Sequence, residues 1–216
     1  YRNKTEIIDF SFSSGALLLG HRSNIFLKCL KDLLKKKISP LASPNTNAVF
    51  FSKILKKIFP HFSKFIFCST GSESVVKALR ISNSISNNNL VISVSGSWHG
   101  STDKTLFAAN KKMQTLPLSD GLSKFDLKNI KFIPYNNIKK SKEILDKYKH
   151  KISAIIIEPI QGGLPMYNIK KYLKFLKKYS NTNKKILIFD EMITGLRTDG
   201  KSVQSIYGIK PDISLF

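Results

Sequence analysis

The chain has 216 residues, 42% of them hydrophobic, which is enough for one ordinary core and a small second lobe. Its apolar runs are strand-sized, far below the roughly 18 residues of a membrane-spanning helix, and no apolar signal-peptide segment follows Tyr1. Two cysteines, Cys29 and Cys68, exclude a disulfide scaffold and lack metal-ligand spacing; a single bridge stays open, and two thiols in a reducing cytosol fit better. We expect a cytoplasmic globular protein with no bound metal and no membrane partner.

The formal net charge is +22, from 36 basic and 14 acidic residues. All but four of the basic residues are lysines, whereas proteins that read nucleic acid favour arginine, whose planar fork pairs with guanine edges and phosphates. The lysines are spread along the whole chain, as is typical of solvated helix faces. A lysine-rich nucleic-acid binder therefore stays a secondary hypothesis, and we expect no nucleic-acid partner.

The first part of the chain predicts helices. Residues 24–37 and 48–59 carry apolar side chains at helical spacing with lysines opposite, and Pro60 ends the second segment. Residues 65–68 form a short apolar run that predicts a strand. The turn that follows this run opens a third helix.

The middle of the chain alternates strand and helix. Residues 90–94 are rich in β-branched side chains and predict a strand that ends at the loop 95–100. After an irregular stretch, residues 131–134 predict a strand and residues 141–149 a short helix.

The last part predicts buried strands. Residues 154–157 and 186–189 are apolar throughout, and between them Ile169, Tyr172 and Leu176 recur at helical spacing. Strands that are apolar on both faces and alternate with helices are typical of a parallel sheet covered on both sides. The predicted fold class is therefore α/β.

Ligands of open α/β sheets bind beyond the carboxyl ends of the strands. After residues 65–68 come Thr70, Gly71 and Ser72 at the start of a helix, where free N–H groups, two hydroxyls and a glycine suit a phosphate. A plain helix N-cap, with Glu73 in the first turn, explains the same residues. On this segment alone the second interpretation is favoured.

Two further strand ends carry notable side chains. Trp98, the only tryptophan, follows residues 90–94 and is suited to stacking on a planar ring, or else packs under its own loop. The neighbouring His99, taken alone, is a structural hydrogen-bonding residue. Asp190 follows residues 186–189, where a buried carboxylate needs a cation or several donors. A protonated heterocycle nitrogen would serve, but so would an N-cap role or a pair with Arg197.

A polar turn follows residues 154–157, with Glu158 and Gln161 ahead of two glycines. Each of these four features is weak by itself. Because parallel strands end at the same edge of a sheet, their coincidence indicates one ligand site at that edge.

The motifs, in this order, resemble those of the class III (ω-) aminotransferase family, which includes glutamate-1-semialdehyde aminomutases. Residues 69–73 (Ser-Thr-Gly-Ser-Glu) resemble the family's Asn-Ser-Gly-Thr-Glu, residues 98–100 (Trp-His-Gly) its Tyr-His-Gly, and residues 158–162 (Glu-Pro-Ile-Gln-Gly) its Glu-Pro motif. Residues 189–197 (Phe-Asp-Glu-Met-Ile-Thr-Gly-Leu-Arg) are similar to Phe-Asp-Glu-Val-x-Thr-Gly-x-Arg. The resemblance implies the pyridoxal-phosphate-dependent transferase fold type I, with a mostly parallel sheet and helices on both faces.

The resemblance also implies pyridoxal 5'-phosphate as cofactor and a role for each matching residue. Thr70, Gly71 and Ser72 would hold its phosphate, and Trp98 would stack on its ring, with His99 beside it. Asp190, the predicted catalytic residue of this chain, would pair with the ring nitrogen and keep it protonated. Met192 would pack on the ring face opposite Trp98. Ser69 and Gly163 stand where aminomutases have Asn.

The family's Schiff-base lysine has no counterpart among the 216 residues and would fall just past Phe216. We therefore expect an incomplete chain. The resemblance divides it into residues 1–23, an amino-terminal segment that contributes to a small domain, and residues 24–216, a partial large cofactor-binding domain.

The expected function is that of a class III aminotransferase or aminomutase, which moves an amino group between a small-molecule amino donor and a carbonyl acceptor. The complete enzyme is expected to be a homodimer. The alternatives are a catalytically silent module that binds a phosphorylated ligand on the same fold and, less favoured, the nucleic-acid binder.

Overall fold

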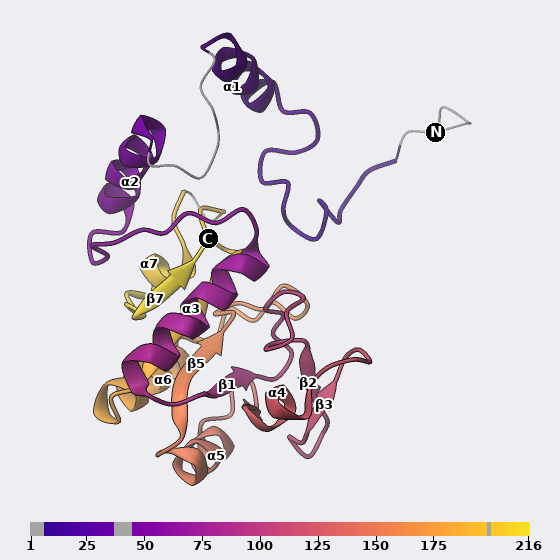
Figure 1. Ribbon diagram of the computed structural model, residues 1–216, viewed down its shortest axis with the longest axis vertical. Coiled ribbons are helices and arrows are strands. Elements are labelled where there is room, and N and C mark those ends of the chain that lie inside the picture. The colour runs from indigo at the N-terminus through magenta and orange to yellow at the C-terminus, as the bar shows by residue number, and fades with distance from the viewer. Residues whose placement is uncertain (1–6, 37–44, 198–199) are drawn as a thin grey trace. The chain divides into compact units, whose positions relative to one another are not determined.

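Five parallel strands form the main sheet, in the order β4-β1-β5-β6-β7. Figure 1 labels β1, β5 and β7 of this sheet. The computed structural model describes residues 7–36, 45–197 and 200–216. Four strands confirm the sequence-based predictions within two residues, and β7 was not predicted. The strands are β1 (Leu90–Val94), β4 (Ile130–Ile133), β5 (Ile152–Ile157), β6 (Ile186–Asp190) and β7 (Ile213–Leu215).

Side chains alternate between the two faces of this sheet, as the pleat of a strand requires. On β5, Ala154 and Ile156 pack with α3 (Gly71–Ser86) in one apolar cluster. Ile155 and Ile157 belong to a second cluster that contains residues of α5 (Ile138–Tyr148) and α6 (Lys170–Thr182). The sheet is therefore covered by helices on both faces, which confirms the predicted α/β class (Figure 1).

Two compact units divide the chain, one within the first 54 residues and one from residue 55 to residue 216. The first contains α1 (Asn24–Lys35) and the start of α2 (Thr46–Ile58). Both segments are helical, as the sequence predicted. The predicted last residue of the first helix, Lys37, lies outside the described residues. The predicted division into residues 1–23 and 24–216 concerns the domains of the family and stays a prediction. Residues 1–6 of its first segment lie outside the described residues.

The irregular stretch of the sequence holds two strands that were not predicted. β2 (Phe107–Ala109) and β3 (Thr115–Pro117) form an antiparallel hairpin, followed by α4 (Lys124–Lys128). Phe107 of the hairpin packs with Ile130 and Phe132 of β4 in a third small cluster. A further short helix, α7 (Val203–Tyr207), precedes β7.

The predicted strand at residues 65–68 is wrong, because this segment pairs with no strand. Ile66 and Phe67 are 60% and 44% exposed, so their apolar character does not reflect a place in the sheet. The helix α3 therefore follows a loop rather than a strand. Within the described residues, no helix combines the length and the hydrophobicity that crossing a membrane requires.

Candidate functional site

The start of α3 lies against the loop that follows β1. Thr70 caps the helix, because its hydroxyl accepts a hydrogen bond from the N–H of Glu73 at 3.1 Å. The hydroxyl of Ser72 accepts another from the N–H of Ser101 at 3.1 Å. Gly100 is so close that a Cβ added there would collide with Ser72. The N–H groups of Gly71 and Ser72 have no acceptor among the described residues, as expected for the first turn of a helix.

The same helix start also touches the segment that follows β6. A Cβ added at Gly71 would lie 3.1 Å from Cε of Met192. Any larger residue would therefore push Met192 away. The glycine allows the helix N-terminus and the residues after β6 to approach each other, and this places Gly71 and Met192 in one site.

A buried histidine–aspartate pair joins the ends of β1 and β6. Nδ1 of His99 lies 2.7 Å from Oδ2 of Asp190, and Asp190 is 4% exposed. The other oxygen of Asp190 accepts the N–H of Met192 at 3.3 Å. The hydrogen-bonding role expected for His99 is thus observed, with Asp190 as its partner. Nε2 of His99 is buried and, among the described residues, has no hydrogen-bond partner.

The turn after β5 supplies two more buried polar side chains. Glu158 accepts the N–H of Trp98 at 2.7 Å, and Gln161 donates to the carbonyl oxygen of Ser95 at 2.9 Å. Burial raises the pKa of Glu158, although the hydrogen bond from Trp98 acts in the opposite direction. The indole of Trp98 itself does not pack under its loop, since the residue is 56% exposed. The sequence alternative of a buried structural tryptophan is therefore wrong.

Glu191, the neighbour of Asp190, was missed by the sequence reasoning. Its fully buried carboxylate accepts from the N–H groups of Val203 and Gln204 at the start of α7, and from the hydroxyl of Thr194. Burial raises the pKa of Glu191. The signal in the sequence was its place in the motif of residues 189–197, where Glu191 stands next to Asp190.

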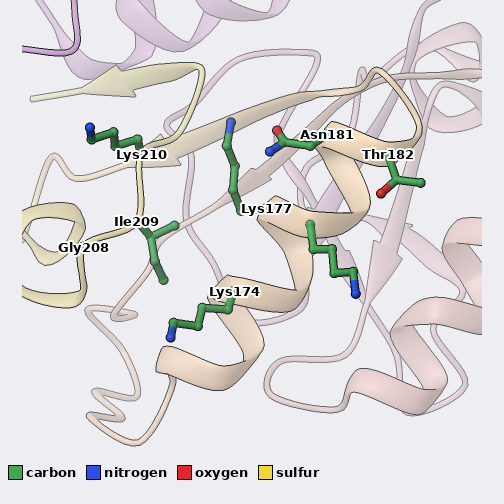
Figure 2. Close-up of a pocket in the computed structure, with 8 residues that line it drawn as sticks. Lys174, Lys177, Asn181, Thr182, Gly208, Ile209 and Lys210 are labelled. Atoms are coloured by element: carbon green, nitrogen blue, oxygen red, sulfur yellow. The ribbon is translucent and has the colours of Figure 1, made fainter.

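A concavity of about 440 Å³ lies elsewhere, between α6 and residues 208–210 (Figure 2). Its lysines do not converge on one point: Lys174, Lys177 and Lys210 point in different directions in Figure 2. Lys177 is paired with Asp212 at 2.7 Å. The candidate site is therefore the edge of the sheet, where loops from four elements meet.

Comparison with known proteins places this arrangement in a family. The class-III aminotransferase family model matches residues 2–216. The chain is 33% identical over 210 residues to a glutamate-1-semialdehyde 2,1-aminomutase of Archaeoglobus fulgidus, covering 96% of this chain and 50% of that protein. A protein of the same name from Clostridium acetobutylicum is 29% identical, with 98% and 50% covered. The chain thus spans about half the length of the curated relatives it matches.

Solved structures share the fold. An omega-transaminase from Sphaerobacter thermophilus aligns with a TM-score of 0.86 at 22% identity, covering 95% of this chain and 49% of that one. A glutamate-1-semialdehyde-aminomutase from Pseudomonas aeruginosa aligns with a TM-score of 0.77 at 16% identity, with 95% and 45% covered. The sequence, the fold and the order of the motifs agree, and the chain belongs to the class-III aminotransferase family.

Proposed function

We propose that this chain supplies the phosphate, ring and proton-holding contacts for pyridoxal 5'-phosphate in an enzyme that moves an amino group between an amino compound and a carbonyl compound. Family membership supports the choice of cofactor, as do two solved structures of the same fold, one a transaminase with PLP bound and one an aminomutase in complex with PMP. The residues of the site also have to fit it.

Three observations support a fit between the site residues and this cofactor. The N–H groups at the start of α3 are available to an anion, at the positive end of the helix dipole. The indole of Trp98 is exposed at the same edge and offers a flat apolar face. Asp190 is buried at the end of β6 with a lone pair left on each oxygen, which suits a protonated ring nitrogen.

Each group then has a defined task. The start of α3, with Ser72, binds the phosphate, and Trp98 and Met192 hold the two faces of the ring. His99 orients the carboxylate of Asp190, which keeps the ring nitrogen protonated through its negative charge. When bound, the cofactor supplies an electron sink for the carbanion formed at the amino-bearing carbon.

The observation that carries this proposal is the buried His99–Asp190 pair. A buried carboxylate costs free energy unless a cation or donors surround it, and a protonated ring nitrogen would be such a cation. The test is Asp190→Asn in the full-length protein. A neutral amide does not hold the ring nitrogen protonated, so amino transfer should fall by about 10²–10³, the loss typical when one preorganised polar group that stabilises a transition state is removed. The thermal midpoint should stay near that of the parent.

The matched control is Asp120→Asn, which makes the same change at an exposed position. It should leave amino transfer unchanged. Near-parental activity of Asp190→Asn would remove Asp190 from the site, and bound cofactor without any amino transfer in the parent protein would favour the silent binding module.

The reaction favoured among those of the family is an aminomutase reaction on glutamate 1-semialdehyde, because eight relatives with 29–33% identity share that name. Assaying the full-length protein with this substrate, and with common pairs of amino acid and oxo acid, separates the aminomutase from a transaminase. A small-molecule donor and acceptor, a cytoplasmic location and a homodimer complete the proposal. The cofactor-linked lysine is proposed to lie outside these 216 residues.

A further inference from the structure

The turn after β5 ties together the ends of three neighbouring strands. Tyr135, beyond β4, donates its hydroxyl to the carbonyl oxygen of Pro159 at 3.1 Å. Gln161 donates to the carbonyl oxygen of Ser95 at 2.9 Å and to the hydroxyl of Ser97 at 3.0 Å, both beyond β1. Because β1 lies between β4 and β5 in the sheet, this turn contacts the loops that follow both neighbours of β5 on that side, including the loop 95–100.

The close approach between Gln161 and the loop after β1 depends on Gly96. Its φ is +89°, a conformation that side chains rarely adopt, and a Cβ at this position would lie 2.8 Å from Oε1 of Gln161. The loop is therefore built to meet this turn. It leads directly into Trp98.

Glu158 makes the contact that involves Trp98 itself. One carboxylate oxygen accepts the main-chain N–H of Trp98 at 2.7 Å, and the other accepts the N–H of Gly162 at 3.3 Å. The residue is 6% exposed, and burying a carboxylate is costly unless N–H donors compensate for the lost water. Both oxygens are thus committed to main-chain N–H groups from two different loops.

The indole is much freer than the main chain that carries it. With 56% of the residue exposed, packing against the chain restricts the ring only in part. The backbone of Trp98 determines where the side chain starts and which rotamers are allowed, and so contributes to the direction of the ring. The 2.7 Å bond to Glu158 is the contact that holds its N–H.

We propose that Glu158 is a positioning residue: through the main-chain N–H of Trp98, its carboxylate sets the direction in which the indole faces the cofactor. This role rests on the proposed function, because the ring of Trp98 has to meet the cofactor there. In this role Glu158 acts through Trp98 and not through contact with the cofactor or the substrate.

The only tryptophan of the 216 residues reports on this role. The fluorescence of Trp98 is isolated by subtracting the signal of Trp98→Phe, and its anisotropy and quenching by acrylamide are measured without cofactor. Glu158→Gln leaves a single acceptor oxygen for two N–H groups, so one of them faces an amide NH₂. We expect lower anisotropy and stronger quenching of Trp98. Glu143→Gln, at an exposed position of α5, is the matched control and should behave as the parent.

A titration with pyridoxal 5'-phosphate separates this inference from the proposed function. Trp98 of the parent should be quenched by the bound cofactor. In Glu158→Gln, half-quenching should need about two- to tenfold more cofactor, the factor that corresponds to ordering one loosened side chain on binding. Absence of quenching in the parent contradicts the proposed function, whereas the cofactor-free anisotropy still decides whether Glu158 holds Trp98.

Parental anisotropy and quenching in a folded Glu158→Gln variant overturn the inference. Glu158→Asp is the second variant, because it keeps the charge but withdraws the oxygens by one methylene; it should also loosen Trp98. Circular dichroism and the thermal midpoint establish that each variant is folded. If neither variant folds, Glu158 serves the fold as a whole and the positioning role is wrong.

Discussion

Helices α1 and α6 have the same design but different surroundings. Each has an apolar stripe opposite lysines, and each is 12 or 13 residues long. In α6 the stripe is buried against the sheet, with Tyr172, Leu173 and Leu176 fully buried. In α1 no residue is buried, and Phe26 and Leu34 are largely exposed. The amphipathic pattern therefore determines that a helix forms and which side is apolar, whereas burial depends on what other segments place against that side.

The largest expected effect that follows from this contrast is on stability. Leu176→Ala leaves a cavity in the packed core and should lower the free energy of unfolding by about 2–5 kcal/mol. Leu30→Ala in α1 removes a side chain that is 42% exposed and should change it by no more than about 0.5 kcal/mol. Urea unfolding of both variants tests the contrast. Equal losses would mean that α1 is covered in solution.

The second prediction concerns the polar groups buried beneath α6. The hydroxyl of Tyr172 donates to the carbonyl oxygen of Pro134 at 2.9 Å and lies 3.0 Å from the hydroxyl of Ser141. Tyr172→Phe removes both hydrogen bonds, while Ser141 still donates to the carbonyl oxygen of Pro134 at 3.1 Å, so the variant should lose about 0.5–1.5 kcal/mol in unfolding free energy. Tyr167→Phe, at an exposed position, is the control and should be neutral. If both variants unfold at the same urea concentration, buried hydrogen bonds do not separate the two regions.

The third prediction compares how α3 and α1 begin. Thr70 caps α3 through its side chain, whereas Ser23 makes no such bond at the start of α1. Thr70→Ala should therefore lower the unfolding free energy by about 1 kcal/mol. Ser23→Ala should leave it unchanged. Thermal unfolding measures both, and a loss on Ser23→Ala would show that α1 is capped in solution.

The smallest expected effect is on the pH dependence of stability. Its sign differs between Glu191, in the unit from residue 55 to residue 216, and Asp9, in the first unit. Burial raises the pKa of Glu191 above its ordinary value of 4.5, so the folded state holds its proton more tightly. Stability from this group is present below pH 4.5 and is lost as pH rises through the raised pKa, by at most about 1.4 kcal/mol per pH unit. The hydrogen bond from His21 lowers the pKa of the exposed Asp9, so its contribution is instead lost as pH falls.

Unfolding of the parent, of Glu191→Gln and of Asp9→Asn between about pH 2 and pH 7 separates these two contributions. Glu191→Gln should remove a downward slope of stability above pH 4.5, and Asp9→Asn a shallow upward slope below pH 3.8. A stability profile of Glu191→Gln that parallels the parent would show that Glu191 titrates normally.

The sequence predicted those parts of the fold that local pattern controls. Strand β1 was predicted to the residue, because a β-branched run stands between an Asn-rich turn and a Gly-Ser loop. Residues 65–68 were misread because an apolar run does not reveal whether a partner strand exists. The hairpin β2–β3 was missed because each strand has three residues and much of β3 is exposed.

The site was predictable in its residues but not in its contacts. The motifs marked Gly71, His99 and Asp190, whose roles toward a cofactor stay predictions. The 91 residues between His99 and Asp190 hid their hydrogen bond, since only the sheet brings the ends of β1 and β6 to one edge. The hydrogen bond from Trp98 to Glu158 likewise joins segments that no local spacing relates.

The position of β1 in the sheet also affects how the chain folds. Its neighbours both come later in the chain: Val91 pairs with Ile130, and Ile92 pairs with Ile155. Contacts between such distant segments form slowly, because a long loop has to close before they contribute any stability. At a synthesis rate of about 5–20 residues per second, roughly 3–13 s pass between the synthesis of β1 and that of its partner strand β5. Over that interval the apolar side chains of β1 are exposed, and this is when we expect the nascent chain to depend most on chaperones.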